Sequence, residues 1–131
     1  MLTARPGTVA GWPRALLRLE GAALLAAASL LFRAQGGSWE MFAALFLVPD
    51  VAVAAFLAGP RIGSIVYNAL HTTLGPLLLI GAGYGAGRSL FVQMGLVWLA
   101  HIGFDRALGF GLKYASGFAA THLRMADFPK R

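Results

Sequence analysis

The stretch LFVQMGLVWLAHIGFDRALGF, residues 90–110, is apolar for most of its length yet contains His101, Asp105 and Arg106. Its length is close to the roughly 20 residues with which an α-helix crosses a hydrocarbon core. Three similar segments precede it, at about residues 16–32, 41–58 and 62–82. None of the four alternates apolar with polar residues, so helices are predicted rather than strands. We therefore expect an all-α fold, a four-transmembrane-helix bundle forming a single membrane domain over residues 1–131, with 115–131 as a cytoplasmic tail.

The composition also indicates a membrane protein. Of the 131 residues, 58% are apolar and only 12% are charged, whereas soluble domains have about 25% charged residues. The chain has no cysteine, which excludes disulfides, thiolate metal sites and cysteine nucleophiles. Glu20 interrupts the first apolar run, so this run is interpreted as a retained helix rather than a cleaved signal peptide.

The basic residues predict the orientation. Cytoplasmic loops are enriched in lysine and arginine, and an arrangement with both termini cytoplasmic gives the inner side far more of them than the outer side. We therefore expect a multi-pass protein of the bacterial inner membrane. The net charge of +6 is then explained by basic flanks beside the helices, and no nucleic-acid partner is expected. The lipid bilayer is the expected partner, and an oligomer or a membrane partner is left open. The inner residues would be Arg5, Arg14, Arg18, Arg61, Arg106, Lys113, Arg124, Lys130 and Arg131, and the outer ones Arg33 and Arg88.

Polar residues lie at one common depth in the four predicted helices. Counted at 1.5 Å per residue from the cytoplasmic ends, they lie about 9–15 Å into the membrane. Ionisable groups inside a span usually face the bundle interior, so helices of opposite direction would bring these side chains together. The layer consists of Glu20, Asp50, Asn68, His71, His101 and Asp105.

Local spacing supports this convergence. Asn68 and His71, and likewise His101 and Asp105, have the spacing of neighbours on one helix face. Gly103, Ala107 and Gly111 form a stripe of small residues that allows a neighbouring helix to approach closely. Pro49 and Pro76 each remove a helical hydrogen bond and free a backbone carbonyl near the same level. Met94 and Trp98 are interpreted as packing or lipid contacts, and His122 as a solvated tail residue.

Several functions fit the polar layer. Carboxylates and imidazoles from several helices resemble the ligand sets of helical-bundle metal proteins, and one Zn or Fe ion fits better than two. The alternatives are a His–Asp proton relay, as in a proton, ion or small-solute transporter or an accessory subunit, an acid–base enzyme, and a purely structural network. Glu20 lies near the boundary, where it can pair with Arg18. The candidate metal ligands are Glu20, Asp50, His71, His101 and Asp105, and the candidate catalytic residues are His101, Asp105, His71 and Asp50.

Several motifs resemble an uncharacterised bacterial membrane family known as domain of unknown function 4260. They are FLVPD (46–50), LAGPRIG (57–63), YNALH (67–71), WLAHIGFDRALGFGLKY (98–114), LEG (19–21) and THL (121–123). At Phe110 the family motif leads us to expect tyrosine, a departure that leaves the polar layer intact. The resemblance implies a four-helix membrane protein. It implies no activity or cofactor, so no catalytic residue is taken from it.

Overall fold

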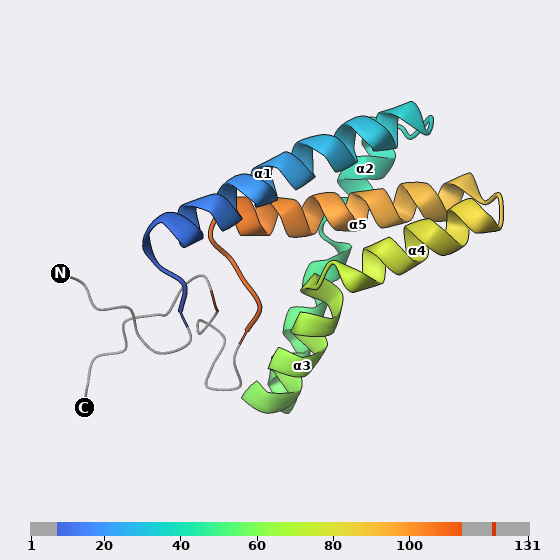
Figure 1. The fold of residues 1–131 in the computed structure, drawn as a ribbon. Coiled ribbons are helices and arrows are strands. Elements are labelled where there is room, and N and C mark those ends of the chain that lie inside the picture. Colours follow the sequence, from blue (N-terminus) through green and yellow to red (C-terminus); the bar gives the residue numbers. More distant parts are fainter. Residues whose placement is uncertain (1–7, 114–121, 123–131) are drawn as a thin grey trace, which may run out of the picture.

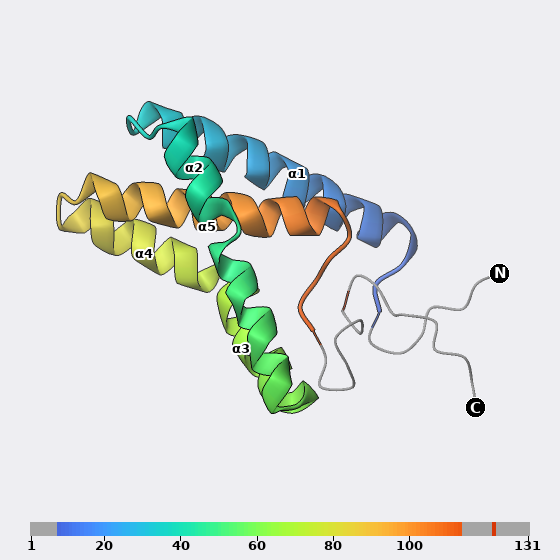
Figure 2. The same ribbon diagram turned by 180° about the vertical axis from the view of Figure 1, so that it is seen from behind.

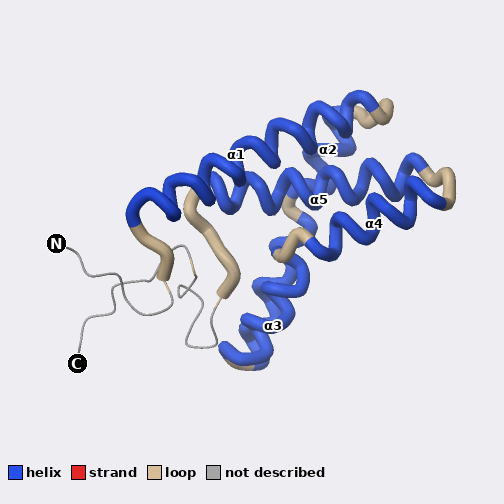
Figure 3. Tube along the Cα trace, viewed as in Figure 1, coloured by secondary structure: helices blue, strands red, loops and turns tan. Residues whose placement is uncertain are grey.

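The computed structural model describes residues 8–113 and residue 122. This part of the chain consists of helices and the loops that connect them (Figure 3). The all-α fold is therefore confirmed. The elements are α1 (Gly11–Ala34), α2 (Trp39–Phe46), the 3₁₀ helix η1 (Val48–Ala58), α3 (Pro60–His71), α4 (Leu74–Gly85) and α5 (Ser89–Ala107). The predicted tail, residues 115–131, lies outside the described residues except for His122.

The long helix α5 lies at the centre of the fold. It runs between α1 and α4, antiparallel to both, and α2 crosses near it (Figure 1). The apolar core fills the space around α5, mainly towards α1 and α2. Its buried members are Ala28, Phe32, Val92, Leu96, Val97, Leu99 and Ala100.

Helices α1 and α5 approach each other closely at two glycines. A Cβ atom at Gly103 would lie 2.7 Å from the backbone oxygen of Gly21, and one at Gly21 would lie 2.8 Å from the oxygen of Gly103. Contact of this kind requires residues without side chains. The predicted close-packing role of Gly103 is thus confirmed, whereas Gly111 of the same stripe lies beyond the end of α5.

Helix α5 ends earlier than the predicted boundary near residue 110. Gly109 has a φ of 89°, a left-handed conformation that glycine adopts without steric cost. Its N–H donates to the oxygen of Arg106 at 3.0 Å, and the N–H of Phe110 donates to the oxygen of Asp105 at 2.8 Å. These two bonds form a Schellman motif, which terminates the helix one turn after the polar residues.

The predicted third span, 62–82, lies within the apolar helical stretch Pro60–Gly85, which is broken into two helices. The chain becomes extended at Thr72 (φ −84°, ψ 148°), which separates α3 from α4. Pro76 then lies in the first turn of α4, where a backbone N–H has no partner within the helix and proline is tolerated. The proline therefore begins a new helix after a break instead of kinking one long helix.

The second segment also changes its geometry near the same level. Its α-helical part, α2, ends at Phe46, and η1 continues as a 3₁₀ helix with Pro49 in its first turn. The hairpin of η1 and α3 projects from the layer of α1, α4 and α5 as an arm (Figure 2). Two changes in helix geometry thus meet where the arm joins the layer, a region that we call the elbow (residues 46–50 and 71–74).

Three helical stretches among the described residues are long and apolar enough to cross a membrane: Gly11–Ala34, Trp39–Ala58 and Pro60–Gly85. The stretch of α5 is not one of them, since polar residues lower its hydropathy. It is instead the helix with the most buried residues, and its neighbours α1 and α4 separate it from the surroundings. The membrane character of the protein is therefore supported. A count of four spans additionally requires that α5 crosses the membrane.

Candidate metal centre

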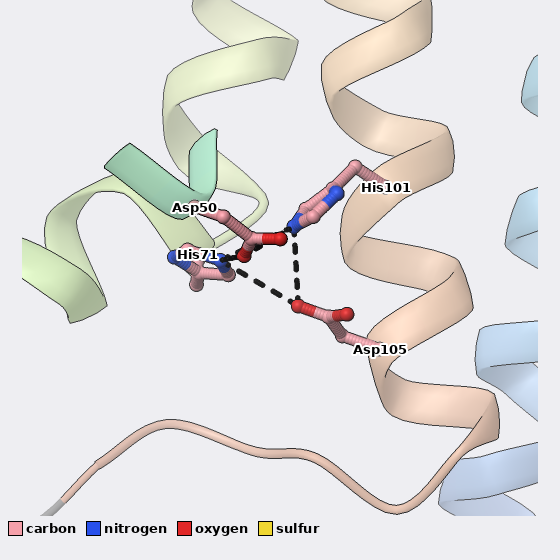
Figure 4. A group of neighbouring side chains, drawn as sticks. All are labelled: Asp50, His71, His101 and Asp105. Atoms are coloured by element: carbon pink, nitrogen blue, oxygen red, sulfur yellow. Dashed lines mark hydrogen bonds and ion pairs between the residues drawn. The ribbon is translucent and has the colours of Figure 1, made fainter. Parts of the chain in front are cut away.

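Two histidines and two aspartates meet at the elbow. Asp50 comes from the first turn of η1, His71 is the last residue of α3, and His101 and Asp105 lie one turn apart on α5. Their side chains point towards one another (Figure 4). One ligand atom from each residue can be chosen so that all four lie within 4.8 Å of one another. We call these four residues the His–Asp cluster.

The distances within the cluster are nearly equal. His101 Nε2 lies 3.2 Å from Asp50 Oδ1 and 3.2 Å from Asp105 Oδ2. His71 Nε2 lies 3.4 Å from Asp50 Oδ1 and 3.5 Å from Asp105 Oδ2. The two Nε2 atoms are 3.3 Å apart. A tetrahedral ion with bonds of about 2.0–2.1 Å to its ligands has ligand–ligand edges of about 3.3–3.4 Å. Five of the six edges of the cluster therefore match those of a tetrahedral metal site.

The backbone of α3 fixes the orientation of the His71 ring. His71 Nδ1 lies 2.9 Å from the carbonyl oxygen of Tyr67. A carbonyl can only accept a hydrogen bond, so Nδ1 carries the proton and Nε2 directs its lone pair into the cluster. The Tyr67 ring stacks on the imidazole at 3.7 Å with an interplanar angle of 5°. Such outer contacts are typical of histidines that bind metals.

The His101 ring is held mainly by packing. Its side chain is 1% exposed, and the ring of Phe46 contacts it edge-on at a centroid distance of 5.2 Å. Its Nδ1 atom has no hydrogen-bond partner among the described residues. The Nε2 side of this imidazole faces both carboxylates and His71.

The break after α3 exposes carbonyl groups that side chains then satisfy. The last carbonyls of a helix have no partner within it. The oxygen of Leu70 accepts a bond from Trp98 Nε1 at 2.6 Å, and the oxygen of His71 accepts one from Arg106 at 3.5 Å. These two contacts attach the end of α3 to α5. The break thus positions His71 beside His101.

The segment after α5 covers the other side of the cluster. Asn68 donates to the oxygen of Lys113 at 2.7 Å and accepts from its N–H at 2.6 Å. The Lys113 ammonium lies 4.4 Å from the centroid of the Tyr67 ring. Burial lowers the pKa of Lys113 below its usual value. Asn68 therefore fixes the backbone that closes the site and does not belong to the cluster.

His122 also attaches to this segment, so the prediction of a solvated tail residue was wrong. Its Nδ1 accepts from the N–H of Leu112 at 2.9 Å, and its own N–H donates to the oxygen of Leu112 at 3.1 Å. Burial, and then the positive charge of Arg106, lower the pKa of His122. The imidazole is thus held neutral as an acceptor.

The cluster is accessible from one side. The side chains of His71 and Asp105 are 4% and 16% exposed, whereas that of Asp50 is 43% exposed. Asp50 also belongs to the arm, while His101 and Asp105 belong to the central layer. Water or another ligand can therefore reach the cluster beside Asp50.

The structure brings together four of the five predicted ligands. Glu20 is exposed on α1 and lies outside the cluster. The prediction missed the supporting residues, although two had a visible signal. Tyr67 precedes His71 by four residues and Trp98 precedes His101 by three, so each shares a helix face with a histidine. The roles of the predicted ligands and catalytic residues remain predictions.

A family model described as domain of unknown function (DUF4260) matches residues 14–126. No curated protein and no solved structure matches the chain significantly.

Proposed function

Because the chain belongs to the family of domain of unknown function 4260, whose description assigns no activity, we propose a function from the site itself. The protein binds one divalent metal ion inside a helical membrane domain, and the ligands are the two histidines and two aspartates of the His–Asp cluster.

The nearly equal distances among four potential ligand atoms carry this proposal. Five of their separations are 3.2–3.5 Å. The lone pair of His71 Nε2 and two carboxylates converge there with His101. Acceptors at these distances repel one another unless a cation or shared protons lie between them. A purely structural network or a proton relay would need protons at this point, whereas a metal ion satisfies all four atoms at once.

Zinc or ferrous iron suits this ligand set. Both bind imidazole nitrogen and carboxylate oxygen, and zinc prefers four ligands in a tetrahedron. Two carboxylates and one divalent cation also have a net charge of zero, which reduces the cost of placing charge away from water. Because Asp50 is exposed, one position on the metal ion can exchange its ligand with solvent, which a sealed structural site would not allow. An exchangeable position of this kind would suit Lewis-acid or acid–base chemistry.

We further propose that α5 is a fourth span and that both termini are cytoplasmic. The end of α1, which contains Arg33, and the start of α5, which follows Arg88, lie at one end of the helical layer, while the start of α1 and the end of α5 lie at the other (Figure 1). This agrees with the bias of basic residues towards the proposed inner side. The bacterial inner membrane is the corresponding proposed location.

Elemental analysis of the detergent-purified protein tests the metal site. We expect about one zinc or iron ion per chain in the wild type, and a loss of most of this metal in His101→Ala. His122→Ala is the matched control, since it removes a histidine that lies outside the cluster. A folded wild type that contains no metal, and takes up none when zinc or ferrous iron is supplied, would overturn the proposal.

A further inference from the structure

An apolar groove lies beside the His–Asp cluster. It has a volume of about 230 Å³, and its walls include Pro49, Leu70, Leu79, Met94 and Trp98. Pro49 and Leu70 directly precede the ligands Asp50 and His71, and Trp98 is one helical turn before His101. The groove is therefore built from the same three elements that supply the cluster, together with α2 and α4.

Trp98 is a fixed wall of this groove. Its indole N–H donates to the oxygen of Leu70 at 2.6 Å. Its ring packs on Gly75, where an added Cβ atom would lie 2.5 Å from the ring. Since the tryptophan is held at both its polar and its apolar part, the groove is preformed rather than opened by a moving side chain.

Positive charge lies close to the cluster. Arg106 follows the ligand Asp105 and interacts electrostatically with it, and Lys113 interacts with Asp105 and Asp50. A divalent ion in the cluster would offset the charge of both carboxylates. The two basic side chains would then favour an anionic group at the exposed side of the site.

From the start of α5 to its end, the helix carries first the groove residues Met94 and Trp98, then the cluster residues His101 and Asp105, and finally the basic residue Arg106. Met94 and Asp105 are separated by about 16 Å at 1.5 Å per residue, and α5 ends two residues after Asp105. A membrane lipid has the same order, with an acyl chain towards the bilayer interior and a charged headgroup at the boundary.

We propose that this site binds an anionic phospholipid, with one acyl chain in the groove and the headgroup at the exposed side of the His–Asp cluster, beside Asp50. The preference for an anionic headgroup rests on the proposed metal site, whereas the acyl-chain site rests on the groove. The lipid is thus a candidate substrate or effector of the metal centre.

Native mass spectrometry of the zinc-loaded protein in detergent, with added short-chain phosphatidylglycerol or phosphatidylcholine, tests this proposal. Leu79→Trp fills part of the groove, and Leu78→Trp is its control because Leu78 is 73% exposed on the same helix. We expect Leu79→Trp to weaken phosphatidylglycerol binding about tenfold, as if about two methylene groups were kept out of the groove. Leu78→Trp should bind like the wild type.

The headgroup is tested with Arg106→Gln and, as a control, with the exposed Arg61→Gln. We expect Arg106→Gln to remove the preference for phosphatidylglycerol over phosphatidylcholine, and Arg61→Gln to retain it. Equal binding by Leu79→Trp and Leu78→Trp, or no headgroup preference in the wild type, would overturn the lipid site. The metal content of the same samples separates the two proposals. Metal-loaded protein without selective lipid binding refutes only the lipid site, and metal-free protein whose lipid binding still depends on Leu79 refutes only the metal site.

Discussion

Removing one ligand from the His–Asp cluster should weaken metal binding by a predictable amount. Structural zinc sites with four protein ligands contribute about 10–16 kcal/mol, or about 3–4 kcal/mol for each ligand. The loss of one ligand thus corresponds to a weakening of about 10²–10³-fold. We expect Asp105→Asn and His71→Ala to lie in this range, since both side chains are largely buried and water cannot easily replace them.

Asp50→Asn should have a smaller effect. The Asp50 side chain is 43% exposed, so a water molecule can occupy the vacated position. We expect a weakening of about 10–10²-fold for this variant. The order of effects, with Asp50 below Asp105 and His71, follows from burial alone.

Competition with a fluorescent chelator in detergent measures these affinities, and circular dichroism checks that each variant remains helical. His122→Ala should bind metal like the wild type. If folded Asp105→Asn bound zinc within about threefold of the wild-type affinity, the four side chains would not form one coordination sphere, and the reasoning from their distances would be refuted.

Three further predictions concern the packing around the site. Gly103→Val should lower the free energy of unfolding by about 1–3 kcal/mol, because α1 leaves no room for a side chain. Gly81→Ala is the control, since nothing lies within 4 Å of its Cβ position. Equal thermal stability of the two variants would contradict the close approach of α1 and α5. Asn68→Ala should cost about 1–3 kcal/mol through two lost hydrogen bonds to the backbone of Lys113, seen as faster hydrogen exchange at residues 111–113 with unchanged metal content. The stability contributed by neutral His122 should be fully present above about pH 6.5, the usual pKa of histidine. It should fall at lower pH, because the unfolded chain then binds a proton that the folded chain resists. His122→Ala should remove this part of the pH dependence of chemical unfolding, and an unchanged pH profile would contradict the role of His122.

The convergence of the cluster could be predicted because one physical rule governs it. Ionisable groups are costly in hydrocarbon, so Asp50, His71, His101 and Asp105 at one depth were expected to face one another. The same rule failed for Glu20. This residue lies nearer the predicted boundary, where water can solvate a carboxylate, and the structure leaves it exposed on α1.

The elbow could not be predicted from the sequence. No glycine or asparagine, the residues that usually mark a helix end, is present at Thr72 or Thr73. The sequence is also apolar on both sides of these two threonines. The hydrogen bond that Pro76 removes is equally compatible with an irregularity inside a long helix and with the first turn of a new one. The choice between these arrangements depends on tertiary contacts, mainly the bond from Trp98 to the carbonyl of Leu70.

Trp98 illustrates a second limit. An indole in an apolar segment usually contributes packing, and its N–H donor becomes informative only when a carbonyl lacks a helical partner. That unpaired carbonyl exists because of the break after α3. Sequence patterns therefore predicted which residues form the cluster, while the residues that support them depend on a backbone irregularity that no local pattern shows.

X-ray absorption spectroscopy of the zinc-loaded protein tests the central claim most directly. We expect about four nitrogen and oxygen ligands near 2.0–2.1 Å, with the outer-shell scattering of two imidazoles and without sulfur. A zinc ion coordinated mainly by water, or scattering from fewer than two imidazoles, would contradict the proposed centre.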